Sequence, residues 1–491
     1  MSEEMKDTSN VMDTAPAAGE KSAEDIALME FTDQEIRDYE EGTLTNKEKA
    51  KFLLLSPLPN AIIKFSLIGI GLVAAILWLV GAMVPDVFNG FYRGFTGVLA
   101  AINNIMPFSV FEILIILTAL GWLGYLVFVL VRFIQVHKTG KLLGMRMWIQ
   151  FGYSTLALVM VYTMLFSFGY GIVGSRTSFQ KASASAEGVQ LYTNATVKET
   201  ELSETLVYLI DKLNTTVINA QSDATNQQIV YTANSGASQY NVKGNANLQL
   251  AEDVSNAFQK AAADIPALKG AKLSAKELLT GPIFNSLNVG SMYSPITGEI
   301  LINPYFPEVS IPMLVAKAIA KQRGFQSDSQ ADMIAYLVCT RYSDNPYVQY
   351  SAYFNAYVST GSKLAKRNQS TYATVASALK ESIKKEVIYY TRKLDSLYGN
   401  SSSLQFADNG GVSTAAEYYL EYPELMINYY RQKMASYADD STELNCGYYV
   451  NSLVDLYRQD LDYQTEINNV VAKYAEYKVE TQQKTTTQSA S

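Results

Sequence analysis

Residues that commonly bind metals or act as bases are scarce in this chain of 491 residues, which has one histidine, His137, and two cysteines, Cys339 and Cys446. A site that needs several imidazoles or more than two thiolates cannot be built from them. These counts exclude four-cysteine zinc modules, classical zinc fingers, three-histidine catalytic zinc and copper centres with several histidines. We therefore expect no metal or other cofactor. A disulfide between the two cysteines stays an open alternative, because nothing in the sequence shows that they lie close together.

Three apolar runs dominate the first part of the chain and must position whatever follows them. Each is about as long as the 20 residues that a helix needs to span a bilayer, and they cover residues 65–84, 111–131 and 148–173. Gly71 and Ala75 are small residues four apart in the first run, a spacing that suits close helix packing but also occurs in ordinary apolar spans. The sequence therefore predicts a membrane protein with three transmembrane helices.

Lysine and arginine near the span ends predict the orientation of these helices, because basic loops stay in the cytoplasm. The loop at 85–109 has only Arg93, whereas the segments before the first span and between the second and third are basic, with Lys47, Lys49, Lys51, Lys64, Arg132, Lys138, Lys141 and Arg146. We therefore expect a multi-pass protein of the cell membrane whose N-terminus is cytoplasmic and whose chain beyond about residue 174 is extracytoplasmic. His137 falls in the basic cytoplasmic loop.

Charge and composition divide the chain into four parts. Residues 1–60 form an acidic cytoplasmic segment that we expect to be partly disordered, 61–174 the membrane region, 175–480 an extracytoplasmic domain, and 481–491 a disordered polar tail. The first 61 residues hold 14 acidic and 6 basic side chains, and the remainder is neutral. Without a basic patch the chain has no means of neutralising phosphates, so nucleic acid is not an expected partner.

The extracytoplasmic domain shows helical periodicity through most of its length. The periodic stretches are 197–220, 248–265, 312–323, 329–342, 371–397, 415–434 and 448–477. One apolar, isoleucine-rich strand is predicted at 299–303, after a turn at 294–298. The region also holds 28 of the 34 tyrosines, which we expect to pack in and near the core. The fold class is thus a mainly α membrane protein, with a mostly helical outer domain and a small β element.

Several motifs in this outer domain resemble the bacterial family called domain of unknown function 3810. They are YSPITGE at 293–299, NPY at 303–305, VAKAIAKQRGF at 315–325, ADMIAYLVC at 331–339 and YSAYF at 350–354. PFSVFE at 107–112 is similar to the start of the family's second span. The resemblance extends over roughly residues 65–455.

Members of that family look like membrane-anchored zinc metallopeptidases with a zincin-like domain and an HExxH motif on one helix. In such a motif two histidines four apart bind zinc, the glutamate polarises water, and the next helix gives a third ligand. The resemblance puts Lys317 and Lys321 at the two histidine positions, Ala318 at the glutamate and Gln330 at the third ligand. Protonated lysine has no lone pair for a metal, and alanine cannot move a proton. The resemblance therefore implies a degenerate zinc motif with neither zinc ligands nor a general base.

Lys317 and Lys321 share one helix face, so they could pair with carboxylates such as Asp328 or Asp332, remain solvated, or attract an anionic ligand into the cleft. In metallopeptidases of this shape an edge strand lines the substrate groove, and an edge strand can bind an extended peptide through main-chain hydrogen bonds. The corresponding residues here are Glu299, Ile300, Leu301, Ile302 and Asn303.

These observations favour a catalytically inactive, membrane-anchored metallopeptidase homologue with a binding or assembly role at the cell envelope. Its expected partners are the lipid bilayer and an envelope protein or peptide ligand. One alternative is a hydrolase with non-zinc chemistry: Ser-His-Asp and Cys-His mechanisms need an outer histidine, but a Ser-Lys pair or two carboxylates do not. Another is a purely structural subunit of a membrane complex.

Overall fold

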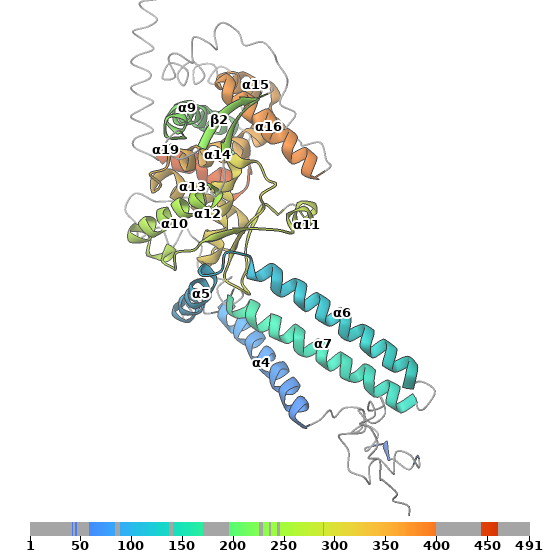
Figure 1. Cartoon of the computed structure of the whole chain (residues 1–491). Coiled ribbons are helices and arrows are strands. Elements are labelled where there is room, and N and C mark those ends of the chain that lie inside the picture. The colour runs from blue at the N-terminus through green and yellow to red at the C-terminus, as the bar shows by residue number, and fades with distance from the viewer. Residues whose placement is uncertain are drawn as a thin grey trace, which may run out of the picture. The chain divides into compact units, whose positions relative to one another are not determined.

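The structure is a computed structural model, and it describes residues 58–83, 89–136, 141–169, 196–224, 229–234, 237–242, 246–287, 289–398 and 443–459, together with 42, 45 and 46. Figure 1 shows these parts as mostly helical, with a few short strands. The predicted mainly α fold with a small β element is therefore confirmed at this level. The acidic N-terminal segment, the tail, His137, the periodic stretch at 415–434 and residues 460–477 lie outside the described residues, apart from the three N-terminal positions.

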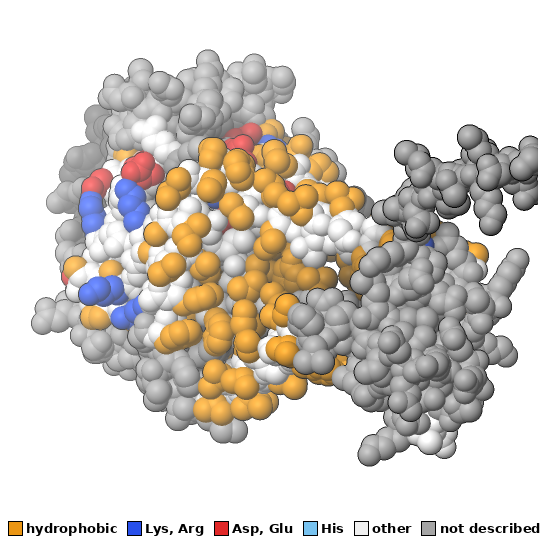
Figure 2. Space-filling model, turned by 60° about the horizontal axis from the view of Figure 1, so that its bottom comes forward, with side chains coloured by type: hydrophobic (Ala, Val, Ile, Leu, Met, Phe, Trp, Pro, Cys, Tyr) orange, Lys and Arg blue, Asp and Glu red, His pale blue; other side chains and the backbone are white. Residues whose placement is uncertain are grey.

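The three apolar runs form long helices, α4 (Leu58–Met83), α6 (Val110–Val136) and α7 (Lys141–Gly169). Each contains a stretch long and apolar enough to cross a membrane, at Ile62–Val80, Val110–Ile134 and Met145–Gly169. The prediction of three helices long and apolar enough to span a membrane is therefore confirmed. Figure 2 shows hydrophobic side chains gathered over a broad face, with the charged side chains at its margin.

The chain divides into two compact units, of which the first is Met1–Val73 with Ile116–Met164. Within it α4 and α7 approach closely at Gly71, where an added Cβ atom would lie 2.9 Å from the carbonyl oxygen of Met160. Thr118 and Tyr162 share a hydrogen bond of 2.7 Å between α6 and α7. The small residue at 71 therefore does allow close helix packing, as its position in the span suggested.

The second unit, Ala74–Ile115 with Leu165–Ser491, holds the helices of the segment that the sequence predicts to be extracytoplasmic, and we name it the outer unit. The most extensive helix packing joins α9 (Glu199–Ala224) to α14 (Pro346–Arg367) and α12 (Ile311–Gln322) to α13 (Asp328–Arg341). Helices α10 (Ala246–Asp264) and α19 (Tyr448–Gln459) also pack on α13. Tyr347, Tyr350 and Tyr357 of α14 are among the largest fully buried side chains. The tyrosines here are core residues, as expected from their density.

A three-stranded sheet lies beside α12 in the order β4-β6-β5. Strand β6 (Ile300–Ile302) pairs in parallel with β4 (Ala275–Glu277) and antiparallel with β5 (Ser291–Tyr293). Two further pairs join β2 (Ile229–Asn234) to β3 (Ala237–Val242) and β1 (Val197–Lys198) to β7 (Glu443–Leu444). The sequence predicted one strand, and the described residues hold six more; of these, β1, β4, β5 and β7 are only two or three residues long and too short to show a period of their own.

Several helices differ from the sequence expectation. The segment treated as the loop 85–109 contains helix α5 (Asn89–Asn104), and the Tyr-rich stretch after Asn345 forms α14, which was not expected. The predicted helix at 371–397 is broken into α15 (Gln369–Ala376) and α16 (Glu381–Tyr398). Short elements complete the unit: α11 (Gly281–Ser286) and the 3-10 turns η3 (Pro266–Leu268) and η4 (Glu308–Ser310).

Candidate functional site

Helices α12 and α13 form a helical hairpin that carries the predicted site. Helix α12 ends in a left-handed glycine, Gly324, with φ of +98°. The amide of Gly324 donates to Lys321 O at 2.9 Å, and that of Phe325 donates to Ala320 O at 3.2 Å. This pair of bonds satisfies the last carbonyls of the helix in the Schellman arrangement, and the buried Phe325 ring anchors it. The chain then turns sharply, so that the first turn of α13 faces the end of α12.

The two lysines at the expected histidine positions meet carboxylates of α13. Lys317 Nζ lies 3.1 Å from Asp332 and 3.8 Å from Asp328 Oδ1. Lys321 pairs with Asp328. The Lys317 and Lys321 side chains are about three-quarters buried, with 24% and 25% of their surface exposed. Of the alternatives left open by the sequence, the structure shows the lysines paired with carboxylates. We name this charge-balanced group of two ammonium and two carboxylate groups the α12–α13 ion cluster.

The two carboxylates of the ion cluster titrate differently. Burial acts to raise the pKa of Asp328, but its hydrogen bond from Lys321 and the charges of both lysines outweigh burial and hold the pKa below its usual value. Asp332 lies deeper, and its burial raises the pKa above the usual value in spite of Lys317. The ion pair to Asp332 is thus the more desolvated of the two.

The other two predicted site residues take no part in the ion cluster. Ala318 is 1% exposed and belongs to the hydrophobic core. Gln330 is half-buried in the first turn of α13, where Asp328 and Asp332 supply the groups that contact the lysines. Among the described residues, no three His, Cys, Asp or Glu side chains are grouped so that they could hold a metal ion. Cys339 and Cys446 are both buried free thiols.

The predicted groove strand is not an edge strand. β6 pairs along both sides, with β4 and with β5, and Ile300, Leu301 and Ile302 are all fully buried. The expectation that Glu299 to Asn303 line an open groove is therefore wrong, because the parallel partner β4 comes from a distant part of the chain. A strand with both edges paired has no main-chain groups left for a peptide.

Glu299, just before β6, instead binds the start of the second apolar helix. Its carboxylate oxygens accept hydrogen bonds from the amides of Val110 and Phe111 at 2.9 and 2.8 Å, and from Thr297 Oγ1 at 2.7 Å. Lys276 Nζ of β4 lies 2.6 Å from the same carboxylate, and both side chains are almost fully buried. A carboxylate at a helix N-terminus satisfies unpaired amides and interacts favourably with the helix dipole.

A second buried carboxylate makes the reciprocal contact from the first turn of α6. Glu112 accepts hydrogen bonds from the amides of Leu279 and Thr280 at 3.0 and 2.7 Å, and from the Thr280 hydroxyl. The Glu299 and Glu112 contacts together tie α6 to the sheet and to α11, and we name them the α6 junction. Sequence analysis missed this role, although the family-like motifs at 107–112 and 293–299 contain both glutamates.

Helix α5 binds the same part of the unit through its buried face. Tyr92 donates to the carbonyl of Gln322 at the end of α12, and Asn103 donates to the carbonyl of Thr297. In the turn before Glu299, Gly298 has φ of +74°, and a Cβ atom there would lie 2.7 Å from Leu99 Cβ. The YSPITGE motif is therefore a docking turn that fits against α5 and α6.

One further buried acid lies away from the predicted site. Glu386 of α16 is 2% exposed and accepts a hydrogen bond from Tyr350 of α14. Burial raises its pKa to about 8, and the charge of Glu308 acts in the same direction. No motif in the sequence singles this residue out.

The family model described as Protein of unknown function (DUF3810) matches residues 88–409, which is more than half of the chain. The chain belongs to this family. The match covers α5, the α6 junction, the sheet and the α12–α13 ion cluster. No curated protein and no solved structure matches the chain.

Proposed function

We propose that this DUF3810 protein is a catalytically inactive, membrane-anchored relative of zinc metallopeptidases that acts by binding or assembly at the cell envelope. Its N-terminus is cytoplasmic in this proposal, and the outer helical domain is extracytoplasmic. The three long apolar helices support the membrane anchor. The metallopeptidase relationship rests on the sequence resemblance described above.

The α12–α13 ion cluster is the observation that carries the proposal. At the positions where a zincin-like site would place two histidines, Lys317 and Lys321 are held by Asp328 and Asp332. Two ammonium groups repel a divalent cation, and their carboxylate partners are already engaged. Ala318 offers no base to activate water. These residues join two helices, and they do not form an open coordination site.

The sheet supports assembly with a folded protein over capture of an extended peptide. Within the three-stranded sheet, strand addition is open at β4 and β5, each of three residues, because β6 is paired on both sides. So short an edge gives few main-chain hydrogen bonds. Buried contacts join the sheet and α12 to α5 and to the start of α6, which suits a scaffold that presents a surface at the membrane.

Elemental analysis of the purified full-length chain tests the proposal. We expect no stoichiometric zinc in the wild type. A variant with Lys317→His, Ala318→Glu, Lys321→His and Gln330→Glu rebuilds the family motif, and we expect it to bind about one zinc ion per chain if the scaffold is metallopeptidase-like. The matched control, Gln259→His with Ala263→His, places two exposed histidines four apart on α10 and should bind no zinc tightly.

Two outcomes would overturn parts of the proposal. One zinc per wild-type chain that is lost on Lys317→Ala or Lys321→Ala would show a working metal site. A rebuilt variant that folds but binds zinc no better than the α10 control would remove the metallopeptidase relationship. The rebuilt variant's folding is checked by its thermal unfolding midpoint, because Glu at the buried position 318 is costly unless the metal site forms.

A further inference from the structure

Helix α5 has an unusual distribution of side chains for a helix beside an outer domain. Its buried face carries polar groups, with Tyr92, Thr96 and Asn103 each at most 5% exposed. The opposite face, which we name the α5 apolar face, is exposed and consists of large apolar side chains at Phe91 (53%), Val98 (61%), Ile102 (53%) and Ile105 (78%). At 100° per residue Phe91, Val98 and Ile102 fall on one stripe of the helix, and Ile105 follows directly after its last residue, Asn104. An exposed helix in water normally shows the reverse pattern.

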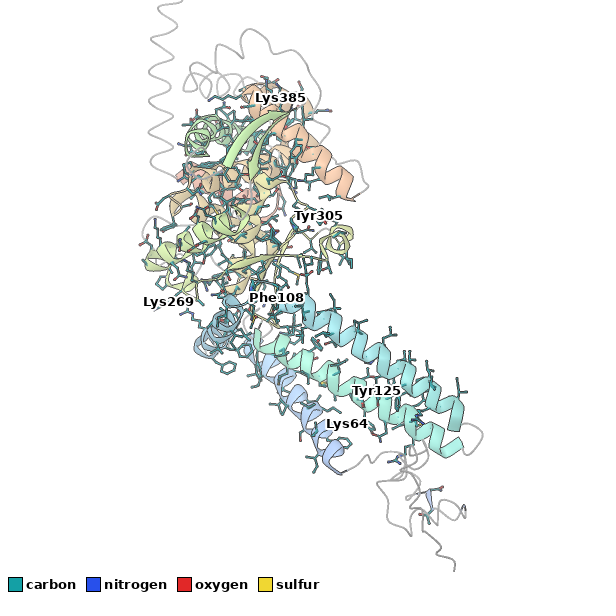
Figure 3. The ribbon with its side chains drawn as sticks, viewed as in Figure 1. Lys64, Phe108, Tyr125, Lys269, Tyr305 and Lys385 are labelled. Carbon is teal, nitrogen blue, oxygen red and sulfur yellow. The ribbon has the colours of Figure 1, made fainter. Side chains whose placement is uncertain are left out.

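The segment around α11 presents a second exposed apolar stripe. Leu279, Ile283 and Leu287 are spaced four apart and are 79%, 63% and 64% exposed. We name them the α11 apolar triplet. Tyr305, which is 45% exposed, packs against the first residue of α11, since its ring would contact a Cβ atom added at Gly281. Figure 3 labels Tyr305 near α11 and Phe108 where the chain enters α6. Side chains of this size rarely stay in water as contiguous patches.

Both stripes are tied to the level at which membrane helices begin or end. Glu112, in the first turn of the apolar stretch Val110–Ile134, accepts the amide hydrogen bonds of Leu279 and Thr280. The rings of Phe91 and Phe95 pack on Phe168, near the end of the stretch Met145–Gly169, at centroid distances of 5.5 and 6.0 Å. The α11 and α5 segments thus share a depth with span ends, where the partner available to apolar side chains is lipid.

Short connections also keep α5 at this level. Five residues, 84–88, separate it from α4, and five, 105–109, separate it from α6. Five residues reach at most about 18 Å when fully extended. The single charged side chain of α5, Arg93, turns away from the apolar face and donates to Pro266 O at 3.2 Å. Nothing charged in α5 opposes contact with lipid.

From these observations we propose that the α5 apolar face and the α11 apolar triplet are immersed in the acyl-chain boundary of the leaflet at which α6 begins. The protein would then contact lipid through α5 and the α11 segment, neither of which spans the membrane, in addition to its three long helices. Amphipathic helices bury such faces about 5–10 Å into the boundary between headgroups and acyl chains. The proposal is independent of whether the protein binds zinc.

Fluorescence quenching on the full-length chain in lipid vesicles tests this. Single cysteines at Val98 and at Ile283 carry a small fluorophore. One quencher is a phospholipid brominated near the top of its acyl chains and built into the vesicles, and the other is iodide added to the solution outside them. The wild type, whose two thiols are both buried, serves as the labelling blank. Phe128 of α6 is the lipid-exposed control and Ser370 of α15 the water-exposed control.

We expect labels at Val98 and Ile283 to be quenched by brominated lipid several-fold more than the label at Ser370, and by iodide several-fold less. Iodide quenching equal to that at Ser370 would overturn the proposal, because the faces would then be in water. Shielding from both quenchers would also overturn it, since a second copy or another protein would then cover the faces. Cysteine at these exposed positions leaves the core intact, and Ile102 and Leu287 provide a second pair of positions.

Discussion

At the scale of single residues, we expect substitution of Lys317 to lower the free energy of unfolding more than substitution of Lys321, the other lysine of the α12–α13 ion cluster. Lys317→Met would leave the mostly buried carboxylate of Asp332 without its cation, which lies 3.1 Å away. We expect a loss of about 1–3 kcal/mol in the free energy of unfolding, the cost of an unsatisfied buried group. Lys321→Met should cost less, about 0–1 kcal/mol, because its partner Asp328 is 69% exposed.

Thermal or denaturant unfolding of the full chain in detergent measures both changes. Lys366→Met, an exposed lysine of α14, is the control and should stay within about 0.5 kcal/mol of the wild type. Asp332→Asn in the Lys317→Met background should recover part of the loss, because it removes the unpaired charge. A double variant as unstable as the sum of the single ones would contradict the pairing.

Glu386 should make the stability depend on pH. Its pKa in the folded chain is about 8, above the ordinary value of 4.5, because it is buried. A carboxyl whose folded pKa is raised contributes stability that is complete below its unfolded pKa and is lost as pH rises through the folded pKa. We therefore expect the wild type to lose stability between about pH 4.5 and pH 8.

Glu386→Gln should flatten this part of the pH profile, since the amide stays neutral and can still accept a hydrogen bond from Tyr350. Unfolding midpoints at pH 5, 6.5 and 8 give the comparison. Glu252→Gln, at an exposed ion pair on α10, is the control and should keep the wild-type slope. An unchanged slope in Glu386→Gln would show that another group causes the pH dependence.

At the scale of elements, the α6 junction is a buried charge pair that also closes a helix N-terminus. Glu299→Gln would leave Lys276, which is 5% exposed, without a counter-charge. Removing one partner of a buried pair costs about 3–5 kcal/mol, whereas removing both often costs much less. We expect Glu299→Gln to destabilise the outer unit strongly and Lys276→Met with Glu299→Gln to be milder.

The exposed pair of Lys272 and Glu252 is the matched control, with side chains 50% and 60% exposed. Lys272→Met should change stability by at most about 1 kcal/mol. Limited proteolysis of the detergent-solubilised chain, read alongside the unfolding midpoint, reports whether the segment from β4 to β6 opens. Equal effects of Glu299→Gln and Lys272→Met would show that the junction does not hold the unit together.

The elements also show what a sequence can reveal. The long spans were predictable because their apolar residues run without interruption, and α12 and α13 because their periodicity is plain. Helix α5 has a helical apolar period in its sequence, but it was missed because residues 85–109 were treated as the loop between two spans. The prediction that β6 is an edge strand was wrong because β6 pairs with β4, whose residues lie some 25 positions away, and no local pattern encodes such a pairing. The lysine positions were informative, but only the fold selects Asp328 and Asp332 from the available carboxylates.

At the scale of the whole molecule, the distribution of basic residues makes a prediction about orientation. Lysine and arginine cluster before the first apolar helix and between the second and third, and the segment between the first and second has only Arg93. The side that holds α5 and the outer helices is therefore expected to be extracytoplasmic.

Cysteine accessibility in intact cells decides the orientation. A cysteine at the exposed position Ser370 should react with a membrane-impermeant maleimide, and one placed in the N-terminal segment at Ser9 should react only after the membrane is permeabilised. The wild type is the blank, because Cys339 and Cys446 are buried. Reaction of Ser9→Cys in intact cells, with Ser370→Cys protected, would invert the topology. The outer helices would then be cytoplasmic, and the proposed role at the cell envelope would fail even if the absence of zinc were confirmed.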